Sequence, residues 1–462
     1  MSQHANLLFA MLAVPALAVS ADIKVQDLGT LGGRITVAAD MNSSGQVTGY
    51  SETADGQIHA FLYANGDLQD LGTLGGAGSL ARAINDAGQI TGFALTATGE
   101  AHAFLYSMGA MIDLGPSGTT SSGKAINASG QIGGQATPSD AQSYALLYSG
   151  AEVNAFGQPH PGSTAEGIGG QGQVTGTYPD KDGSHAFLYN GSAFVDLEPG
   201  YTSFVSGTRS INTAGLVTGG FQIRDTLHGF LYSNGRANDL GSLGGDYTVP
   251  TAINNSGKIT GVSAGADGGH HAFIYSGGSL ADVGTLGGSF SVGYALNELD
   301  QVAGESETSS GQLHAFATQQ GSLIDIGQVV EGFAPGSVTE SFGTGINATG
   351  QVIGRYTVST PSDTAMPMKT RSFFATLAPS ATNLFQELLS LSTGVGPGKS
   401  LVNKLEQALT AYLVHNTAAS CSGLNGYRQE VTAQDGKKIN PQMAAVLLQK
   451  VDALGSAIGC TS

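Results

Sequence analysis

Six histidines occupy one position of a recurring phrase, written HAFLY or a close variant of it, and histidine is the commonest metal ligand in proteins. They are His59, His102, His185, His228, His271 and His314. A shared metal is not expected, because repeats that pack about 10 Å apart cannot bring several rings within the roughly 2.0–2.1 Å that zinc requires. We interpret each as a structural residue whose ring bonds to an adjacent turn. The sequence predicts neither a metal nor a cofactor.

A set of aspartates recurs after the same phrase, at Asp27, Asp70, Asp113, Asp196, Asp239, Asp282 and Asp325. Paired carboxyl groups can hydrolyse a glycosidic bond if they lie about 5 to 9.5 Å apart. One aspartate per repeat keeps them separate, so we interpret them as hydrogen-bond acceptors for main-chain amides at turns and strand ends. The sequence leaves open whether a calcium ion binds in one acidic turn, although no loop has the alternating oxygen ligands of a calcium motif.

Residues that break the repeat are more informative about function. Two loops are longer than their counterparts, at residues 328–342 and 357–371, and loops of this kind commonly bind ligands in repeat folds. Non-repeating polar side chains are expected on the same rim. The predicted ligand-binding residues are His160, Glu166, Asp180, Lys181, Arg209, Arg224, Asp225, Glu340 and Arg355.

Eight repeats position these residues. The phrase begins at residues 59, 102, 144, 185, 228, 271, 314 and 372, which is a period of about 43 residues over most of the chain. Asn-Gly and Asp-Gly pairs mark tight turns, and three turns in a unit imply four antiparallel strands. Four short strands per repeat of this length are typical of a β-propeller blade, and 4 to 8 blades is the usual range.

The two ends of the repeat region predict how the ring closes. The first copy of the fourth-strand phrase, at residues 23–29, precedes every complete unit, whereas the eighth unit has no fourth strand. Closure removes exposed sheet edges. We therefore expect an all-β, eight-bladed propeller over residues 22–379, in which the N-terminal strand completes the last blade.

This repeat resembles the HAF family of extracellular bacterial repeats, which is named for the same His-Ala-Phe phrase. The resemblance covers about residues 22–378, and several phrases recur in register through the eight units. It implies export and a repeat architecture. It implies no reaction.

The chain changes character after residue 379. Leu401, Leu405, Leu409 and Leu413 have the spacing of an amphipathic helix, and Asn440-Pro441 is a helix start. We predict helices at about residues 381–392, 399–415, 420–433 and 441–458, forming a small all-α domain over residues 380–462. This segment resembles the two-cysteine helical module called FIMAH, which implies an accessory or attachment role.

The N-terminus and the cysteines both indicate export. Residues 7–18 are apolar and precede Val19-Ser20-Ala21, which fits a secretory signal peptide over residues 1–21. Cys421 and Cys460 are the only cysteines, and an even pair in an exported protein predicts one disulfide. No other apolar stretch approaches the about 20 residues that span a bilayer, so we expect a secreted or periplasmic protein.

The net charge of the chain narrows the classes of binding partner that we expect. The chain has 18 Lys+Arg against 35 Asp+Glu, a net charge of -17, and the excess acid lies in the predicted propeller. Such a chain is not expected to bind nucleic acid or an anionic membrane. We expect a secreted binding module for a glycan, a peptide or a cell-surface component. The alternatives are a secreted glycan hydrolase or lyase that uses the rim residues, and a structural spacer; no catalytic residue and no oligomeric state is predicted.

Overall fold

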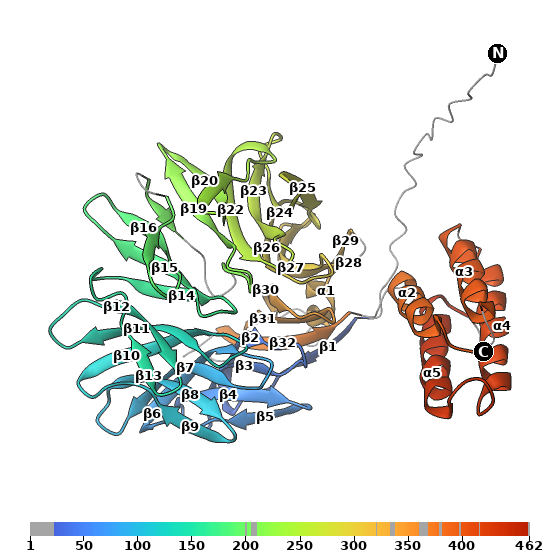
Figure 1. The fold of residues 1–462 in the computed structure, drawn as a ribbon, viewed down its shortest axis with the longest axis horizontal. Coiled ribbons are helices and arrows are strands. Elements are labelled where there is room, and N and C mark those ends of the chain that lie inside the picture. The colour runs from blue at the N-terminus through green and yellow to red at the C-terminus, as the bar shows by residue number, and fades with distance from the viewer. Residues whose placement is uncertain are drawn as a thin grey trace, which may run out of the picture.

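The computed structural model describes residues 23–198, 201–204, 210–319, 321–332, 338–359, 368–377, 381–396, 399–414 and 416–460. The predicted signal peptide lies outside these residues. Within them, the β-strands form eight antiparallel blades of four strands each, arranged in a ring (Figure 1). A single parallel bridge, between His270 and Phe290, joins two neighbouring blades. The predicted eight-bladed propeller is confirmed.

The first four blades follow one another along the chain, and each runs from its innermost to its outermost strand. Blade 1 consists of β2 (Gly32–Met41), β3 (Val47–Thr53), β4 (Ile58–Ala64) and β5 (Asp67–Asp70). Blade 2 consists of β6 (Gly75–Ile84), β7 (Ile90–Thr96), β8 (Ala101–Ser107) and β9 (Ala110–Asp113). Blade 3 consists of β10 (Thr119–Ile126), β11 (Ile132–Pro138), β12 (Tyr144–Ser149) and β13 (Glu152–Asn154). Blade 4 consists of β14 (Thr164–Ile168), β15 (Val174–Pro179), β16 (Ser184–Tyr189) and β17 (Phe194–Asp196).

Blades 5 to 7 repeat this order, and blade 8 takes its fourth strand from the N-terminus. Blade 5 consists of β18 (Ser203–Phe204), β19 (Val217–Ile223), β20 (Thr226–Ser233) and β21 (Arg236–Asp239). Blade 6 consists of β22 (Gly244–Ile253), β23 (Ile259–Gly265), β24 (His270–Ser276) and β25 (Ser279–Gly284). Blade 7 consists of β26 (Gly287–Leu296), β27 (Val302–Thr308), β28 (Leu313–Gln319) and β29 (Ser322–Asp325). Blade 8 consists of β30 (Val338–Ile346), β31 (Gln351–Ser359), β32 (Met368–Thr376) and β1 (Lys24–Asp27).

The N-terminal strand closes the ring, as predicted. β1 pairs antiparallel with β32 from Lys24 opposite Thr376 to Asp27 opposite Phe373. One further main-chain bond, from the Leu28 N–H to the Ser372 carbonyl at 2.9 Å, extends the pairing toward blade 1. The last blade therefore contains strands from both ends of the propeller, and β1 supplies the outer strand that the eighth repeat lacks.

The recurring phrase builds the same core in nearly every blade. Its phenylalanine has no exposed surface in seven blades, at Phe61, Phe104, Phe187, Phe230, Phe273, Phe316 and Phe373. A threonine of the second strand fixes the phrase, as where Thr48 Oγ1 donates to the Phe61 carbonyl at 2.8 Å. A serine of the following blade accepts from the residue before the phenylalanine, as in Ala60 N to Ser79 Oγ at 2.9 Å. The phrase is thus repeated because it joins each blade to the next.

A ring of asparagines links the turns between the first and second strands of the blades. Each amide Nδ2 donates to the main-chain carbonyl at the matching position of the next blade at 2.9–3.3 Å, from Asn42, Asn85, Asn127, Asn212, Asn254, Asn297 and Asn347. The last of these bonds runs from blade 8 back to Asn42 in blade 1. Blade 4 has Gly169 at this position, which has no side chain to donate. The ring is therefore interrupted between blades 4 and 5.

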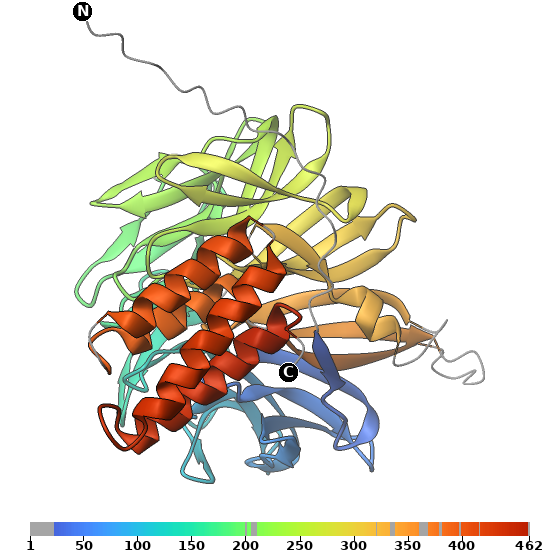
Figure 2. The same ribbon diagram turned by 90° about the vertical axis from the view of Figure 1, so that its right-hand side faces the viewer.

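Four helices follow the propeller at α2 (Ala381–Ser392), α3 (Ser400–Leu413), α4 (Thr417–Gln434) and α5 (Pro441–Ala457), close to the predicted positions (Figure 2). They share one buried core, which includes Phe385, Leu405 and Tyr427. α4 begins earlier than predicted, because the Asn416 side chain caps it by accepting from Ala419 N. The predicted disulfide is confirmed, with 5.5 Å between the Cα atoms of Cys421 and Cys460. In the part of the chain described, no helix is both long and apolar enough to cross a membrane.

Candidate functional site

The repeated histidines and aspartates form pairs within the blades. The histidine lies on the third strand and the aspartate at or near the end of the fourth. Nδ1 lies 2.8–2.9 Å from the nearer carboxylate oxygen in the pairs His59–Asp70, His102–Asp113, His228–Asp239, His271–Asp282 and His314–Asp325. The aspartate also accepts a main-chain N–H beyond its strand, as at Gly72 N at 2.7 Å. The aspartates thus accept main-chain amides as expected, whereas these five histidines bond to the aspartate side chains and not to an adjacent turn. The pairing itself was not predicted, although a constant spacing of 11 residues indicated it.

Two blades lack this pair. Blade 3 has Tyr144 and Ala155 at the two positions, so both partners are replaced together. In blade 8 the register places Phe373 opposite Asp27, as Phe61 is opposite Asp70 in blade 1. Arg371, not Ser372, therefore stands where the histidine would be, and its Nη2 lies 3.0 Å from Asp27 Oδ2. The predicted alignment of the eighth phrase is shifted by one residue.

Blade 4 keeps both residues but separates them. His185 Nδ1 lies 3.7 Å from Asp196 Oδ2, and Nε2 lies 3.0 Å from Asp180 Oδ1 on the turn between the second and third strands. His185 is only 4% exposed, and Nδ1 has no hydrogen-bond partner among the described residues. The Asp196 oxygen is instead bound by the Tyr178 hydroxyl at 3.2 Å.

A single position on the second strand accounts for the difference. The residue paired with the histidine is small in blades 1, 2, 6 and 7, where it is Ser51, Ala94, Ser263 and Ser306. In blade 4 it is Tyr178, whose hydroxyl occupies the aspartate. In blade 5 it is Phe221, which stacks on His228 at 5.4 Å yet leaves the histidine paired. The phenol oxygen, rather than the bulk of the ring, therefore displaces His185.

Exchanging these two aromatic residues tests this cause. In Tyr178→Phe, we expect His185 Nδ1 to move to about 2.8–3.0 Å from Asp196, because the competing hydroxyl is gone. In Phe221→Tyr, we expect the new hydroxyl to separate His228 from Asp239. Crystal structures of both variants measure the two distances. Unchanged distances in both would show that the backbone of blade 4, not Tyr178, sets the geometry.

The separated pair borders a pocket of about 680 Å³ between blades 4 and 5. It lies on the crossover rim, which we define as the turns between second and third strands together with the crossovers between blades. The lining consists of Asp180, Asp182, His185, Asp196, Tyr201, Thr202, Gln222, Ile223 and Arg224. Three carboxylates thus face one guanidinium, and Tyr201 presents a ring that is 43% exposed.

Local backbone geometry fixes the two sides of the pocket. Asp180 Oδ1 accepts the Asp182 and Gly183 N–H groups at 2.6 and 3.2 Å, which folds the blade 4 turn around the carboxylate. On the blade 5 side, Arg224 has a positive φ of 54° in a tight turn, and Gln222 Nε2 donates to its carbonyl at 2.9 Å. The Arg224 guanidinium has no hydrogen-bond or ion-pair partner among the described residues. It is free to bind a ligand.

The electrostatics keep the carboxylate side charged. The hydrogen bond from the Asp182 N–H, with a smaller contribution from His185, lowers the pKa of Asp180. Burial, followed by the charge of Asp196, raises the pKa of Tyr178 to about 12, so its hydroxyl stays protonated and donates. The pocket therefore offers carboxylate acceptors on one side and a cationic donor on the other.

The structure brings together some of the predicted ligand-binding residues. Asp180 and Arg224 line the pocket, and Asp225 follows Arg224 on the same turn. Lys181 forms an ion pair with Asp182 at 2.9 Å. His160 lies beside the pocket wall, where it stacks on Phe194 at 3.8 Å and burial lowers its pKa.

The other predicted residues lie elsewhere. Glu166 lies on the innermost strand of blade 4, 4.0 Å from Lys124 of blade 3. Glu340 and Arg355 belong to blade 8. Arg209 lies outside the described residues. The pocket also contains His185, Asp196 and Tyr201, which were not predicted to bind a ligand; the tyrosine at position 178 was the signal that blade 4 departs from the repeat.

His314 is the most strongly engaged of the paired histidines. Its Nδ1 lies 2.9 Å from Asp325 and its Nε2 lies 3.2 Å from Glu331 of the short helix α1 (Gly327–Glu331). The hydrogen bond with Asp325, partly opposed by burial, raises the pKa of His314 above 6.5. The resulting stabilisation is fully present below the unfolded pKa and is lost as pH rises through the folded pKa.

We expect His314→Gln to lower the urea midpoint of unfolding more at pH 5 than at pH 8. An equal loss at both pH values would contradict this expectation.

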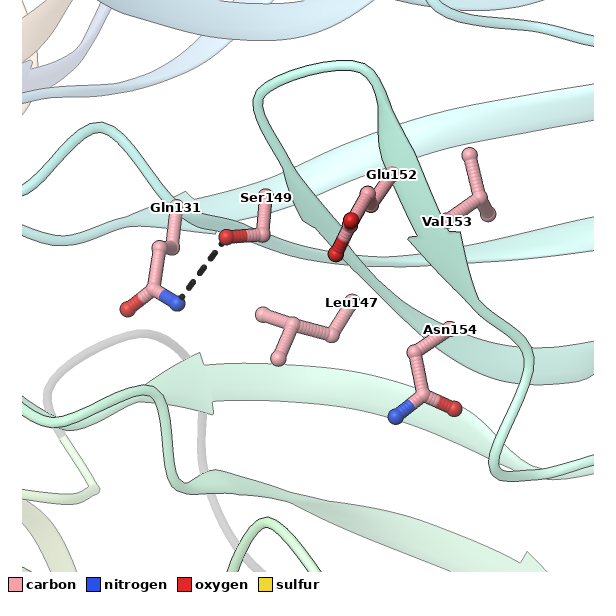
Figure 3. A pocket seen from close by; sticks show the side chains of 6 residues that line it. All are labelled: Gln131, Leu147, Ser149, Glu152, Val153 and Asn154. Carbon is pink, nitrogen blue, oxygen red and sulfur yellow. Dashed lines mark hydrogen bonds between the residues drawn. The ribbon is translucent and has the colours of Figure 1, made fainter.

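A second pocket, of about 470 Å³, lies on blade 3 (Figure 3). It is lined by Gln131, Leu147, Ser149, Glu152, Val153 and Asn154, on the rim opposite the crossover rim. Gln131 Nε2 donates to Ser149 Oγ at 3.3 Å, and Asn154 Nδ2 donates to the Tyr189 hydroxyl at 2.9 Å. Its amides are thus partly engaged, and Glu152 is its one charged lining residue, so the pocket between blades 4 and 5 is the stronger candidate.

No cluster of three or more metal-ligating side chains suited to an ion occurs in the described part of the chain. The residues of the pocket between blades 4 and 5 suit a neutral or polar organic ligand, because they combine carboxylate acceptors, one cationic donor and an aromatic face.

Comparisons with known proteins concern the architecture. No family model and no curated protein matches the chain. Among solved structures, it resembles a Mycobacterium tuberculosis puromycin-hydrolyzing peptidase, with 9% identity and a TM-score of 0.43 over 72% of this chain and 60% of the peptidase. The β-propeller domain of the Trilobed protease from Pyrococcus furiosus matches with 9% identity and a TM-score of 0.38, over 54% of this chain and 83% of that one. The SapL1 lectin in complex with alpha methyl fucoside matches with 13% identity and a TM-score of 0.30, over 55% and 97%.

Proposed function

We propose that this protein is an exported binding module that recognises a glycan through the pocket between blades 4 and 5. The signal-like leader and the disulfide between Cys421 and Cys460 support export, because such disulfides persist in oxidising compartments. The resemblance of the repeat to the HAF family agrees with this location.

One observation carries the proposal. Blade 4 alone holds its repeated histidine away from the repeated aspartate, and this departure lies beside the free guanidinium of Arg224 and the exposed ring of Tyr201. A repeat that serves packing alone has no need of this departure. Binding sites concentrate a few converging polar groups in a cavity of about this size.

The chemistry of the pocket favours a hydroxyl-rich ligand. Asp180 and Asp196 accept hydrogen bonds, Arg224 donates them, and charge-assisted bonds of this kind are about twice as strong as neutral ones. The exposed face of Tyr201 offers apolar area against which the C–H face of a sugar ring can pack. The acidic lining disfavours a polyanionic glycan, so neutral sugars are the expected ligands.

A glycan array tests the proposal on the purified chain from which the predicted signal peptide has been removed. We expect neutral glycans to bind and to be recovered intact. Each bound glycan is then incubated with the protein and analysed by mass spectrometry. Recovery of shortened products would replace the binding module with a hydrolase or lyase that uses the same pocket. If no glycan on the array binds, the structural spacer is favoured.

A further inference from the structure

A third pocket, of about 360 Å³, lies at the centre of the ring. Residues from all eight blades line it, so it belongs to the central channel around which the blades are arranged. The turns between the first and second strands form its mouth, on the rim opposite the crossover rim. We call it the central pocket, and it is separate from the proposed glycan pocket.

The wall of the central pocket is aliphatic. Seven blades each contribute the residue that directly precedes the asparagine position of the repeat, namely Met41, Ile84, Ile126, Ile168, Ile211, Ile253 and Leu296. An inorganic cation prefers a shell of oxygen ligands, which this wall does not offer. A hydrocarbon chain, by contrast, gains free energy by leaving water for such a surface.

The mouth of the central pocket is acidic. Asp86 and Glu298 are the only charged residues among its described lining residues. Each follows the asparagine position and accepts the main-chain N–H of the same position in the preceding blade, from Ser43 at 2.9 Å and from Asn255 at 2.6 Å. No described cation forms an ion pair with either carboxylate.

The negative charges are not needed for these bonds between blades. Asn255 accepts the Thr213 N–H at 3.1 Å in the same way, with a neutral side chain. Asparagine at position 86 would therefore serve the ring as well as aspartate does. The two carboxylates thus provide uncompensated charge at the opening of an apolar cavity, which indicates a ligand that is both cationic and apolar.

We propose that the central pocket binds a linear aliphatic amine. The alkyl chain packs against the aliphatic wall, and the ammonium group donates to the carboxylates of Asp86 and Glu298 at the mouth. The net charge of -17 attracts a cation, and a cavity lined by one sign of charge raises its local concentration. This site does not depend on the proposed glycan pocket.

Isothermal titration with n-hexylamine, in a buffer without amines, tests the proposal on the chain from which the predicted signal peptide has been removed. We expect binding with a Kd below about 5 mM. n-Hexanol keeps the chain but lacks the charge, hexanoate carries the opposite charge, and methylamine keeps the charge but lacks the chain. Each is expected to bind at least about 10-fold more weakly than n-hexylamine.

Substitutions at the mouth locate the site. Asp86→Asn combined with Glu298→Gln removes both charges and keeps an acceptor for each main-chain N–H, so we expect an unchanged melting temperature and at least about 10-fold weaker binding. Asp55→Asn combined with Asp267→Asn removes the same charge from turns of the crossover rim and should bind n-hexylamine as the parent protein does. Ala128 is exposed at the mouth, and Ala128→Lys should abolish binding because it places a competing ammonium there.

Three results would overturn the proposal. The first is a Kd for n-hexylamine above about 5 mM. The second is that n-hexanol, hexanoate or methylamine binds as well as n-hexylamine. The third is that the variant without both mouth carboxylates keeps the affinity of the parent protein, or that the crossover-rim control loses as much affinity.

Discussion

Replacing Arg224 with glutamine is expected to weaken glycan binding by about 10- to 100-fold, which is the usual range for one charge-assisted hydrogen bond. Arg224 is the cationic donor that lines the pocket, and its guanidinium is not engaged by any described residue. Because the side chain stabilises nothing else that the structure describes, the melting temperature should stay constant. Binding is measured by titration with the best glycan of the array.

A matched substitution controls for the loss of positive charge. Arg236 lies at the start of the fourth strand of blade 5, away from the pocket, so Arg236→Gln should bind as the parent protein does. Asp180→Asn and Asp267→Asn form a second pair, since both carboxylates accept the N–H of the residue two positions later in equivalent turns. Only the blade 4 variant should lose binding. Equal losses in both members of either pair would place the ligand elsewhere.

Substitutions in the asparagine ring should have the largest effect on stability. Asn254 is buried, donates to the Asn297 carbonyl at 3.0 Å and accepts the Lys258 N–H at 2.9 Å. Asn254→Ala leaves these buried groups without partners, and we expect the free energy of unfolding to fall by about 2–4 kcal/mol. Urea unfolding followed by fluorescence measures the change.

The interruption at blade 4 predicts the opposite effect for the reverse substitution. A Cβ on Gly169 would lie 3.3 Å from the Asn212 carbonyl and 2.7 Å from the flexible end of Gln173, which can move. Gly169→Asn should complete the ring and stabilise the propeller by about 0.5–2 kcal/mol. Gly169→Ala separates the two contributions, because it restricts the unfolded chain without adding an amide. If alanine stabilises as much as asparagine, the ring bond contributes nothing.

The fold was predictable because the repeat constrains it at several levels. The phrase around Phe61 recurs wherever a blade must bury a phenylalanine and bond to its neighbour, so the period itself indicates the blade. The displaced first copy of the fourth-strand phrase predicted the pairing of β1 with β32. By contrast, α1 has five residues and no side-chain cap, and its sequence carried no helix signal.

The candidate site was predictable only in part. Sequence identified residues that break the repeat, and two of them, Asp180 and Arg224, lie in one pocket. It did not show that Glu340 and Arg355 belong to a different sector, because angular position around a ring depends on blade number rather than on residue type. His185 was not predicted as a binding residue because it matches the histidine of the other repeats. Its displacement depends on the hydroxyl of Tyr178, a contact between side chains that spacing alone does not reveal.

The most direct test of the glycan pocket follows the paired histidines by long-range ¹H–¹⁵N NMR while the best array glycan is added. We predict that the ring nitrogens of His185 shift on binding, because this histidine alone lies in the pocket between blades 4 and 5. The ring nitrogens of His59, His102 and His271 should not move. Binding that leaves His185 unchanged, or shifts a histidine of blades 1, 2 or 6 instead, would contradict the assignment of the site.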